Sequence, residues 1–265
     1  MAFHEVNGVN IRYEVVGRGP PLALIIGYRL HGGAWPEVFV DKLSEQFSVL
    51  TFDARGTGRS DKPGSGYDLH VIATDVLGLL DHLGWPKAHI LGFSMGGAIA
   101  QELAIRHPDR VERLVLFATF PGGLYGVRAS WPILRRLFEL DGLSHEEAAR
   151  QVWPVTYAPG YLSANAKAIE AQMRREIAYP TPPHAARAQR EAIQAFSTTF
   201  RLEQIRAETL VATGADDILV PPENSLRLAH RIPNAKLTTI PSLGHRAIWE
   251  APEETARFIT DFLSN

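Results

Sequence analysis

Residues 88–98 read AHILGFSMGGA, and this stretch decides the fold. Its first part, Ala88–Leu91, is a short apolar run typical of a buried strand, and Met95–Arg106 has the pattern of a helix. Between them, Gly92-Phe93-Ser94-Met95-Gly96 fits Gly-x-Ser-x-Gly, which presents a serine on a strained strand-to-helix turn. The pentapeptide alone also fits a tight turn with a serine N-cap. The strand before it and the helix after it favour a nucleophile at Ser94.

The same alternation of strand and helix extends along the first 120 residues. Asn7-Gly8 is a strong hairpin signal between two short strands. The apolar run Leu22–Gly27 is typical of a strand buried on both faces. Further expected elements are the strands Val49–Asp53 and Val111–Ala118 and the helices Val38–Phe47 and Leu69–Leu83. Buried strands that alternate with amphipathic helices predict a mainly parallel α/β sheet flanked by helices.

The pattern changes after Phe120. Residues 125–200 contain no convincing strand, only helical stretches separated by breaks such as Asp141-Gly142. Alternation resumes with the strand Thr209–Thr213 and continues to the last helix, Pro252–Leu263. We therefore predict a core domain of residues 1–120 and 201–265. A helical cap, residues 121–200, is inserted after the strand at 111–118.

Composition excludes several classes of function. The 265 residues include no cysteine, so disulfides, thiolate zinc sites and cysteine nucleophiles are ruled out. A net charge of −2 leaves no basic surplus for nucleic acid. The apolar runs are too short to span a bilayer, and residues 1–10 lack the apolar segment of a secretion signal. We expect a soluble, cytoplasmic protein that acts on a small molecule without a metal or cofactor.

A serine hydroxyl needs a base within hydrogen-bond reach to act as a nucleophile. Of ten histidines, His245 is the best candidate because it follows the strand Ala235–Ile240 in a loop at the carboxyl edge of the sheet. The base in turn needs an acid to orient it. The strand Thr209–Thr213 leads into a loop with two candidates, Asp216 and Asp217. The order serine, aspartate, histidine is the one expected on this architecture.

The chain resembles the α/β-hydrolase superfamily over nearly its whole length. The resemblance is carried by the segments Phe52–Ser60, Gly92–Gly97, Gly214–Pro221, Gly244-His245 and Trp249–Glu253. In this family, the loop that carries the catalytic acid commonly has the sequence Gly-x-x-Asp-x-x-Val-Pro. Counting back from Val220-Pro221 then implies that Asp217 is the catalytic acid and Asp216 a turn or capping residue.

The glycine-rich stretch Asp53-Ala54-Arg55-Gly56-Thr57-Gly58 lacks the spacing of either nucleotide-binding fingerprint. The resemblance implies instead a structural turn, with Asp53 and Arg55 paired nearby.

The oxyanion hole departs from the family's common pattern. Many relatives carry His-Gly after the strand equivalent to Leu22–Ile26, where this chain has Ile26-Gly27 and then Tyr28. A second stretch, His31-Gly32-Gly33, resembles the loop of lipase-like esterases, so two registers compete. Trp35 lies nine positions after residue 26, as in relatives, and favours the first register.

We therefore predict that the backbone N–H groups of Tyr28 and Met95 form the oxyanion hole. His31 is expected to border the pocket as a loop residue. Aromatic residues of the cap are expected above Ser94, with Phe120, Trp131 and Trp153 as candidates for the pocket wall. For each of them, packing of the cap onto the core is the alternative.

The resemblance implies a serine hydrolase that cleaves a carboxylic ester or lactone through an acyl-enzyme. Ser94 would attack, His245 would transfer the proton and Asp217 would orient His245. Carbon–carbon bond hydrolases and cofactor-free perhydrolases use the same three residue types and stay open as alternatives. So does a small-molecule receptor of this fold. Epoxide hydrolases and haloalkane dehalogenases carry an aspartate at the elbow, and Ser94 argues against both.

Overall fold

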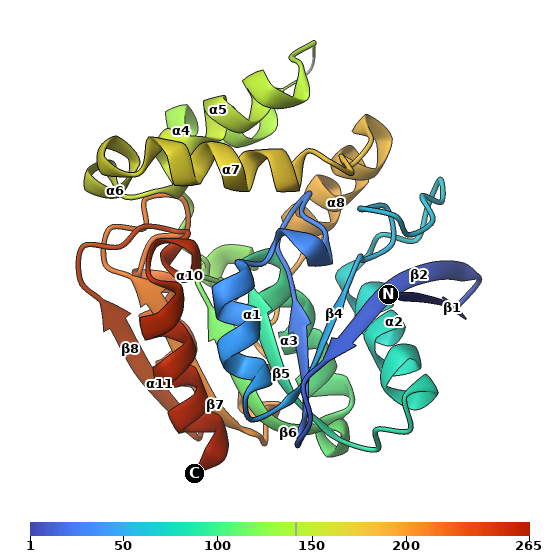
Figure 1. The fold of residues 1–265 in the computed structure, drawn as a ribbon. Helices are drawn as coiled ribbons and strands as arrows, with labels where there is room; N and C mark the ends of the chain where they lie inside the picture. The colour runs from blue at the N-terminus through green and yellow to red at the C-terminus, as the bar shows by residue number, and fades with distance from the viewer. Residues whose placement is uncertain (141) are drawn as a thin grey trace.

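The computed structural model describes residues 1–140 and 142–265, which form one twisted sheet with helices on both faces and above one edge (Figure 1). The strand order is β1-β2-β4-β3-β5-β6-β7-β8. The pairings β1–β2 and β2–β4 are antiparallel, and every pairing from β3–β4 to β7–β8 is parallel. The strands are β1 (Ala2–Val6), β2 (Val9–Val16), β3 (Pro21–Ile25), β4 (Ser48–Phe52), β5 (Ala88–Phe93), β6 (Val111–Phe117), β7 (Glu208–Gly214) and β8 (Ala235–Ile240). The predicted mainly parallel α/β fold is confirmed.

Two layers of helices bury the two faces of the sheet. One layer consists of α1 (Glu37–Ser44), α10 (Ala247–Glu250) and α11 (Pro252–Ser264), and the other of α2 (Leu69–His82), α3 (Met95–Arg106) and α9 (Glu223–Arg231). In β3, Leu22 and Leu24 pack into the first layer, while Ala23 and Ile25 pack into the second. Because both faces are covered, the strand is apolar throughout, as its sequence predicts.

The segment between β6 and β7 forms helices that lie over the carboxyl ends of the parallel strands (Figure 1). They are α4 (Trp131–Phe138), α5 (His145–Thr156), α6 (Pro159–Ala164), α7 (Ala166–Glu176) and α8 (Pro183–Ala195). The helix expected over Ala164–Ile177 is confirmed as α7, and the short helix α6, which the sequence does not predict, precedes it. Of the predicted break at Asp141-Gly142, Asp141 lies outside the described residues. The division of the chain into core and cap stays a prediction.

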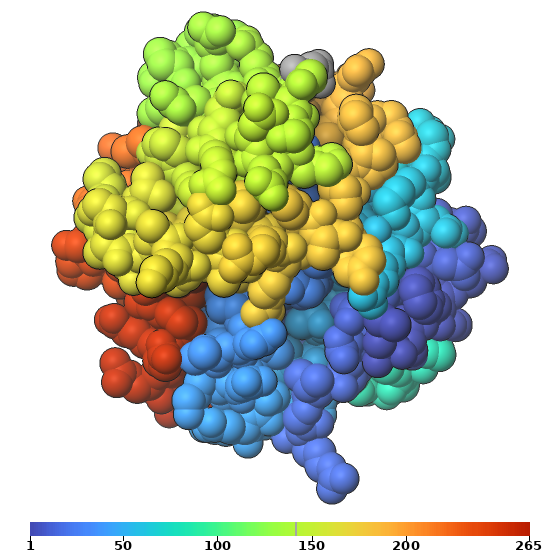
Figure 2. Space-filling model, turned by 45° about the horizontal axis from the view of Figure 1, so that its top comes forward, coloured from blue at the N-terminus to red at the C-terminus, as the bar shows by residue number. Residues whose placement is uncertain are grey.

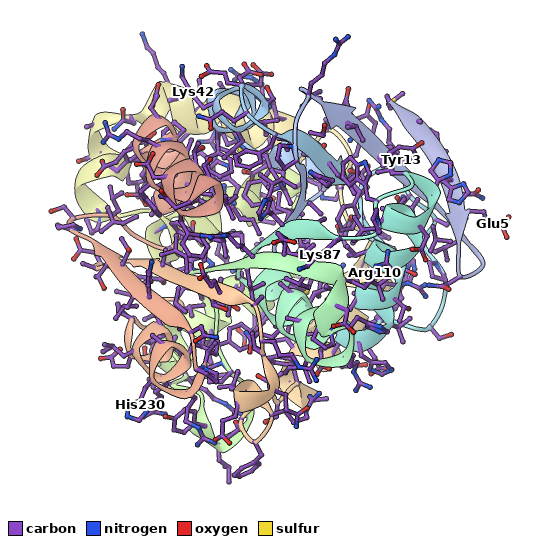
Figure 3. The ribbon with its side chains drawn as sticks, turned by 90° about the horizontal axis from the view of Figure 1, so that it is seen from below. Glu5, Tyr13, Lys42, Lys87, Arg110 and His230 are labelled. Carbon is purple, nitrogen blue, oxygen red and sulfur yellow. The ribbon has the colours of Figure 1, made fainter. Side chains whose placement is uncertain are left out.

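Lys87 and Arg110, which precede β5 and β6, lie at the amino-terminal end of the parallel strands (Figure 3). Lys87 contacts Glu112 at 2.8 Å and Arg110 contacts Asp81 at 2.6 Å. His230, at the end of α9, is exposed to solvent. No helix in the described part of the chain is long and apolar enough to cross a membrane.

Candidate active site

Ser94 stands on the predicted sharp turn between β5 and α3. Its backbone lies at φ 55° and ψ −119°, which is a strained conformation for a residue with a side chain. The turn is closed by two glycines, at which a side chain would collide with the backbone of neighbouring strands or turns. A Cβ on Gly92 would lie 2.4 Å from the carbonyl oxygen of Gly96, and one on Gly96 would lie 2.0 Å from that of Ile25. The pattern Gly-x-Ser-x-Gly is therefore a steric requirement of this turn.

The structure brings together the three side chains that the sequence singles out. The Oγ atom of Ser94 lies 3.1 Å from Nε2 of His245, and Nδ1 of His245 lies 2.7 Å from Oδ2 of Asp217. His245 and Asp217 are buried, whereas Ser94 is partly exposed. With its Nδ1 proton donated to Asp217, the imidazole presents the lone pair of Nε2 to the serine, which is the arrangement of a general base.

The two neighbouring aspartates have different surroundings. Oδ1 of Asp217 accepts the backbone N–H groups of Leu219 at 3.0 Å and Val220 at 2.7 Å, which leaves Oδ2 for His245. Asp216 is exposed on the surface. The loop thus orients only Asp217 towards the histidine, in agreement with the register of the acid loop.

The loop after β3 passes directly beside the serine. A Cβ on Gly27 would lie 3.2 Å from Cβ of Ser94, and Tyr28 and Met95 both border the cavity next to Ser94. Met95 begins α3, so its N–H group points along the positive end of the helix dipole. In the competing stretch, the N–H of Gly32 is donated to Asp53 and that of Gly33 to His31. Both N–H groups of the competing stretch are therefore occupied, and the oxyanion hole at Tyr28 and Met95 stays a prediction.

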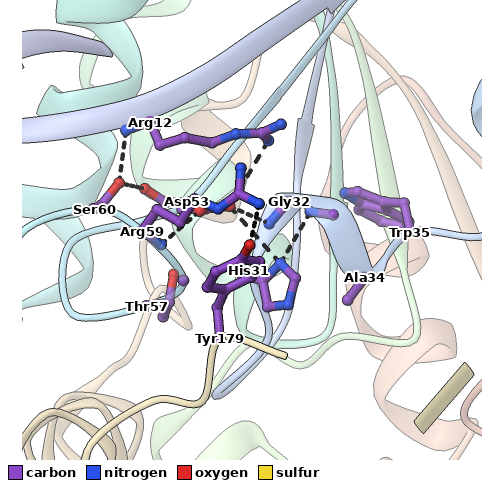
Figure 4. A network of polar contacts seen from close by, with 12 residues as sticks. Arg12, His31, Gly32, Ala34, Trp35, Asp53, Thr57, Arg59, Ser60 and Tyr179 are labelled. Carbon is purple, nitrogen blue, oxygen red and sulfur yellow. Dashed lines mark hydrogen bonds and ion pairs between the residues drawn. The ribbon is translucent and has the colours of Figure 1, made fainter. Parts of the chain in front are cut away.

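A buried polar network holds this loop in place (Figure 4). Asp53 accepts the backbone N–H groups of Gly32 and Arg59, each at 2.8 Å. His31 is buried, and its Nε2 donates to the carbonyl of Arg175 at 3.1 Å. His31 therefore ties the loop to the end of α7 and borders neither cavity beside Ser94, contrary to expectation.

Arg55 belongs to a separate ion pair. It contacts both carboxylate oxygens of Asp75, at 2.6 and 2.7 Å. The glycine-rich turn thus has the structural role expected of it, although Asp53 and Arg55 have different partners.

Two cavities meet at Ser94. The first, here the histidine-side cavity, measures about 130 Å³ and is bordered by Ser94, His245 and residues of α5. The second, here the elbow-side cavity, measures about 290 Å³ and is bordered by Ser94 and Met95 but not by His245.

The three aromatic candidates for the pocket wall have different positions. Phe120 and Trp131 border the elbow-side cavity, and Trp131 is 63% exposed at its mouth. Trp153 borders neither of the two cavities. Its half-buried ring packs against an apolar cluster that includes Tyr157 and Ile169, and the guanidinium of Arg150 lies 5.1 Å from its centre. Trp153 thus packs into an apolar cluster, and the structure gives it no place in the wall of either cavity.

Three charged residues behind His245 join the helical segment to the sheet, and sequence reasoning missed their role. Arg246 forms a buried ion pair with Glu176 of α7, with contacts of 2.5 and 3.0 Å. Burial opposes the charge of Arg246, but the facing carboxylate outweighs it and raises the pKa of the guanidinium. Glu250 accepts the backbone N–H of Gly244, at 3.1 Å, and that of Ala158, at 3.2 Å.

Of these three residues, only Glu250 lies in a segment that the sequence singles out. The segment Trp249–Glu253 is part of the family resemblance, but the resemblance assigns no role to the Glu250 carboxylate. Burial raises the pKa of Glu250, the two backbone bonds oppose this, and the nearby carboxylates of Asp217 and Asp216 add to the rise. Among the described residues, no group of three or more histidine, aspartate or glutamate side chains is arranged to hold a metal ion.

Comparisons with known proteins agree with this architecture. A family model described as the alpha/beta hydrolase fold matches residues 20–252. A protein of Caulobacter sp. (strain K31), provisionally named carbamate hydrolase RutD, is 34% identical over 99% of this chain and 95% of its own. The 2-hydroxy-6-oxo-6-phenylhexa-2,4-dienoate hydrolase of Comamonas testosteroni is 32% identical over 96% of this chain and 91% of its own. The crystal structure of the enol-lactonase from Burkholderia xenovorans LB400 superimposes with a TM-score of 0.88 and 26% identity, covering 100% of both chains.

Proposed function

This chain belongs to the α/β-hydrolase family and is a hydrolase of that fold, and we propose that it cleaves a small carboxylic ester or lactone through an acyl-enzyme on Ser94. The observation that carries the proposal is the contact of 3.1 Å between Ser94 Oγ and His245 Nε2, backed by that of 2.7 Å between His245 Nδ1 and Asp217. Two cavities that meet at Ser94 give room for the two parts of a substrate.

The reaction proceeds in two acyl transfers. Ser94 Oγ bonds to the carbonyl carbon while its proton passes to Nε2 of His245, and the N–H groups of Tyr28 and Met95 stabilise the oxyanion. The bond from carbon to the leaving oxygen then breaks, and that oxygen takes the proton from Nε2. Water next gives a proton to Nε2 and attacks the acyl group. The acid leaves, and the proton returns to Ser94 Oγ.

A second candidate reaction is hydrolysis of a carbon–carbon bond next to a ketone. It is favoured by the 32% identity to a hydrolase named for 2-hydroxy-6-oxo-6-phenylhexa-2,4-dienoate. Hydrolysis of a carbamate is a third candidate reaction, because the relative at 34% identity is named for that activity. Parallel assays with an ester, a lactone, an aryl carbamate and a dienoate ketone rank these reactions by kcat/KM.

The test of the proposal is turnover of p-nitrophenyl butyrate by the wild-type chain and by Ser94→Ala. We expect steady turnover by the wild type and loss of about 10⁴-fold or more in the variant. Ser130→Ala, at the exposed start of α4, is the matched control and should keep wild-type turnover. Equal turnover by Ser94→Ala would refute the assignment. A receptor of this fold would show at most one slow turnover per chain.

A further inference from the structure

The two cavities at Ser94 receive different halves of a substrate. The reason is that the leaving group has to take a proton from His245, whereas the acyl group stays bonded to Ser94. The leaving atom has to lie within hydrogen-bond reach of Nε2 of His245, which gives it a proton. The acyl carbon stays bonded to Ser94, with its oxyanion at the N–H groups of Tyr28 and Met95. His245 borders the histidine-side cavity, whereas Met95 borders the elbow-side cavity. The leaving group therefore extends into the first and the acyl chain into the second.

The elbow-side cavity suits an apolar acyl chain. Its wall is made mainly of apolar side chains, among them Phe120, Val127, Leu134, Phe138 and Ile193. At about 290 Å³ it is larger than the cavity of about 150 Å³ that holds a benzene molecule in another protein. One cation, Arg128, also borders this cavity, and its residue is exposed to solvent.

The leaving-group side is positively charged. The histidine-side cavity shares Arg29, His145 and Thr181 with an outer cavity of about 120 Å³ between α5 and α8. On the face seen in Figure 2, a narrow hollow separates these two segments. Arg29, Arg187 and Arg190 border the outer cavity, and none of its described lining residues is an aspartate or glutamate. The carboxylate on the histidine-side cavity, Glu176, is already paired with Arg246.

Arg29 has a strained backbone conformation that is held by two side chains from the segment between β6 and β7. Its φ of 62° is left-handed, which is uncommon for a residue with a side chain. Its N–H is donated to Oε1 of Gln189 at 3.1 Å, and its carbonyl accepts the hydroxyl of Thr181 at 2.9 Å. Both partners are buried side chains of the helical segment. Two groups thus fix the backbone of Arg29 next to Tyr28, where the residue borders both the histidine-side and the outer cavity.

The guanidinium of Arg29 has no hydrogen-bond or ion-pair partner among the described residues, although the other arginine of the histidine-side cavity, Arg246, is paired. A guanidinium is a planar fork of donors that matches a carboxylate with two parallel hydrogen bonds. We propose that the leaving group of the substrate carries a carboxylate and that Arg29 binds it, while the apolar acyl chain occupies the elbow-side cavity. This inference rests on the proposed ester or lactone hydrolysis at Ser94.

A pair of esters that differ only in this charge tests the inference. The butyrate esters of 4-hydroxybenzoate and 4-hydroxybenzamide share the acyl chain and the ring, and the anion lies on the leaving group of the first. The quantity to compare is the ratio of their kcat/KM values, since the intrinsic difference in reactivity cancels between variants. Arg29→Gln should lower the ratio of anionic to neutral ester by about 10- to 100-fold. Arg29→Lys should restore part of it, because it keeps the charge.

The matched control is Arg128→Gln, which removes one positive charge at the elbow-side cavity. It should leave the ratio unchanged, because the anion lies on the other side of Ser94. An equal fall in Arg128→Gln would mean that general attraction of anions explains the preference, and it would overturn the assignment to Arg29. No wild-type preference for the anionic ester would overturn it as well.

A binding measurement separates this inference from the proposed function and does not depend on the folding of the Arg29 variants. Calorimetric titration of Ser94→Ala with 4-hydroxybenzoate and 4-hydroxybenzamide should give tighter binding of the anion by about tenfold or more. Equal affinities would refute the anion site. If instead neither ester is turned over in a reaction that needs Ser94, the proposed function fails, whatever the titration gives.

Discussion

The two walls of the active site are fixed in different ways. On the sheet side, backbone atoms set the positions: Gly96 lies against the carbonyl of Ile25, and Asp217 accepts two backbone N–H groups. On the helical side, the attachment includes the side-chain pair of Arg246 with Glu176, beside one backbone hydrogen bond from Arg246 to the carbonyl of Thr156 at 2.8 Å. Helix α4 has no buried residue at all. We therefore expect substitutions in the helical wall to alter the cavities and to leave the contacts among Ser94, His245 and Asp217 in place.

Removing the catalytic acid should have the largest effect. Asp217→Asn keeps the size of the side chain but no longer holds His245 in the tautomer that accepts a proton from Ser94. We expect kcat/KM for p-nitrophenyl butyrate to fall about 10⁴-fold. Asp216→Asn is the matched control, and its exposed side chain should leave the rate nearly unchanged. A larger loss in Asp216→Asn would show that the register of this loop is wrong.

A glycine-to-alanine substitution should change the free energy of unfolding in opposite directions on the two walls. In Gly96→Ala, the new Cβ would lie 2.0 Å from the carbonyl oxygen of Ile25, so we expect the free energy of unfolding to fall by about 3 kcal/mol or more. Gly160, in α6, has nothing within 4 Å of such a Cβ, and Gly160→Ala should be stabilising by about 0.5–1 kcal/mol. Urea unfolding measures both. Similar losses in the two variants would contradict the contrast between the walls.

The smallest expected effect is on the pH dependence of stability. Burial raises the pKa of Glu250, so between the usual glutamate pKa of 4.5 and the raised value the folded chain binds more protons than the unfolded one. The stability of the wild type relative to Glu250→Gln should therefore be greatest below pH 4.5 and decline as the pH rises through the raised pKa. Unfolding curves over this range measure the difference.

The contribution of Glu147, in the capping box of α5, to stability should depend on pH in the opposite direction. The bonds from Ser144 lower its pKa, so its contribution is present above pH 4.5 and is lost as the pH falls. Relative stabilities of Glu250→Gln and Glu147→Gln that change in the same direction with pH would contradict the assignment of the two environments.

The sequence predicts the positions of the residues on the sheet side but not of those on the helical side. Ser94 and Asp217 follow the buried strands β5 and β7, and His245 follows the edge strand β8, so the strand pattern and the glycines of the turn place all three at the carboxyl edge of the sheet. The helical wall offers no such rule. Whether Trp153 faces a cavity or the core, and whether Arg29 meets Thr181, depends on how helices far along the chain pack. The sequence shows only that such helices exist.

The central claim is that the oxygen of Ser94 carries the acyl group. Its most direct test is stoichiometric reaction with a fluorophosphonate, followed by peptide mapping by mass spectrometry and assay of the residual esterase activity. We predict one adduct per chain, on Ser94, with loss of turnover in proportion to labelling. An adduct on another residue, or full turnover by a chain that is fully labelled at Ser94, would contradict the account.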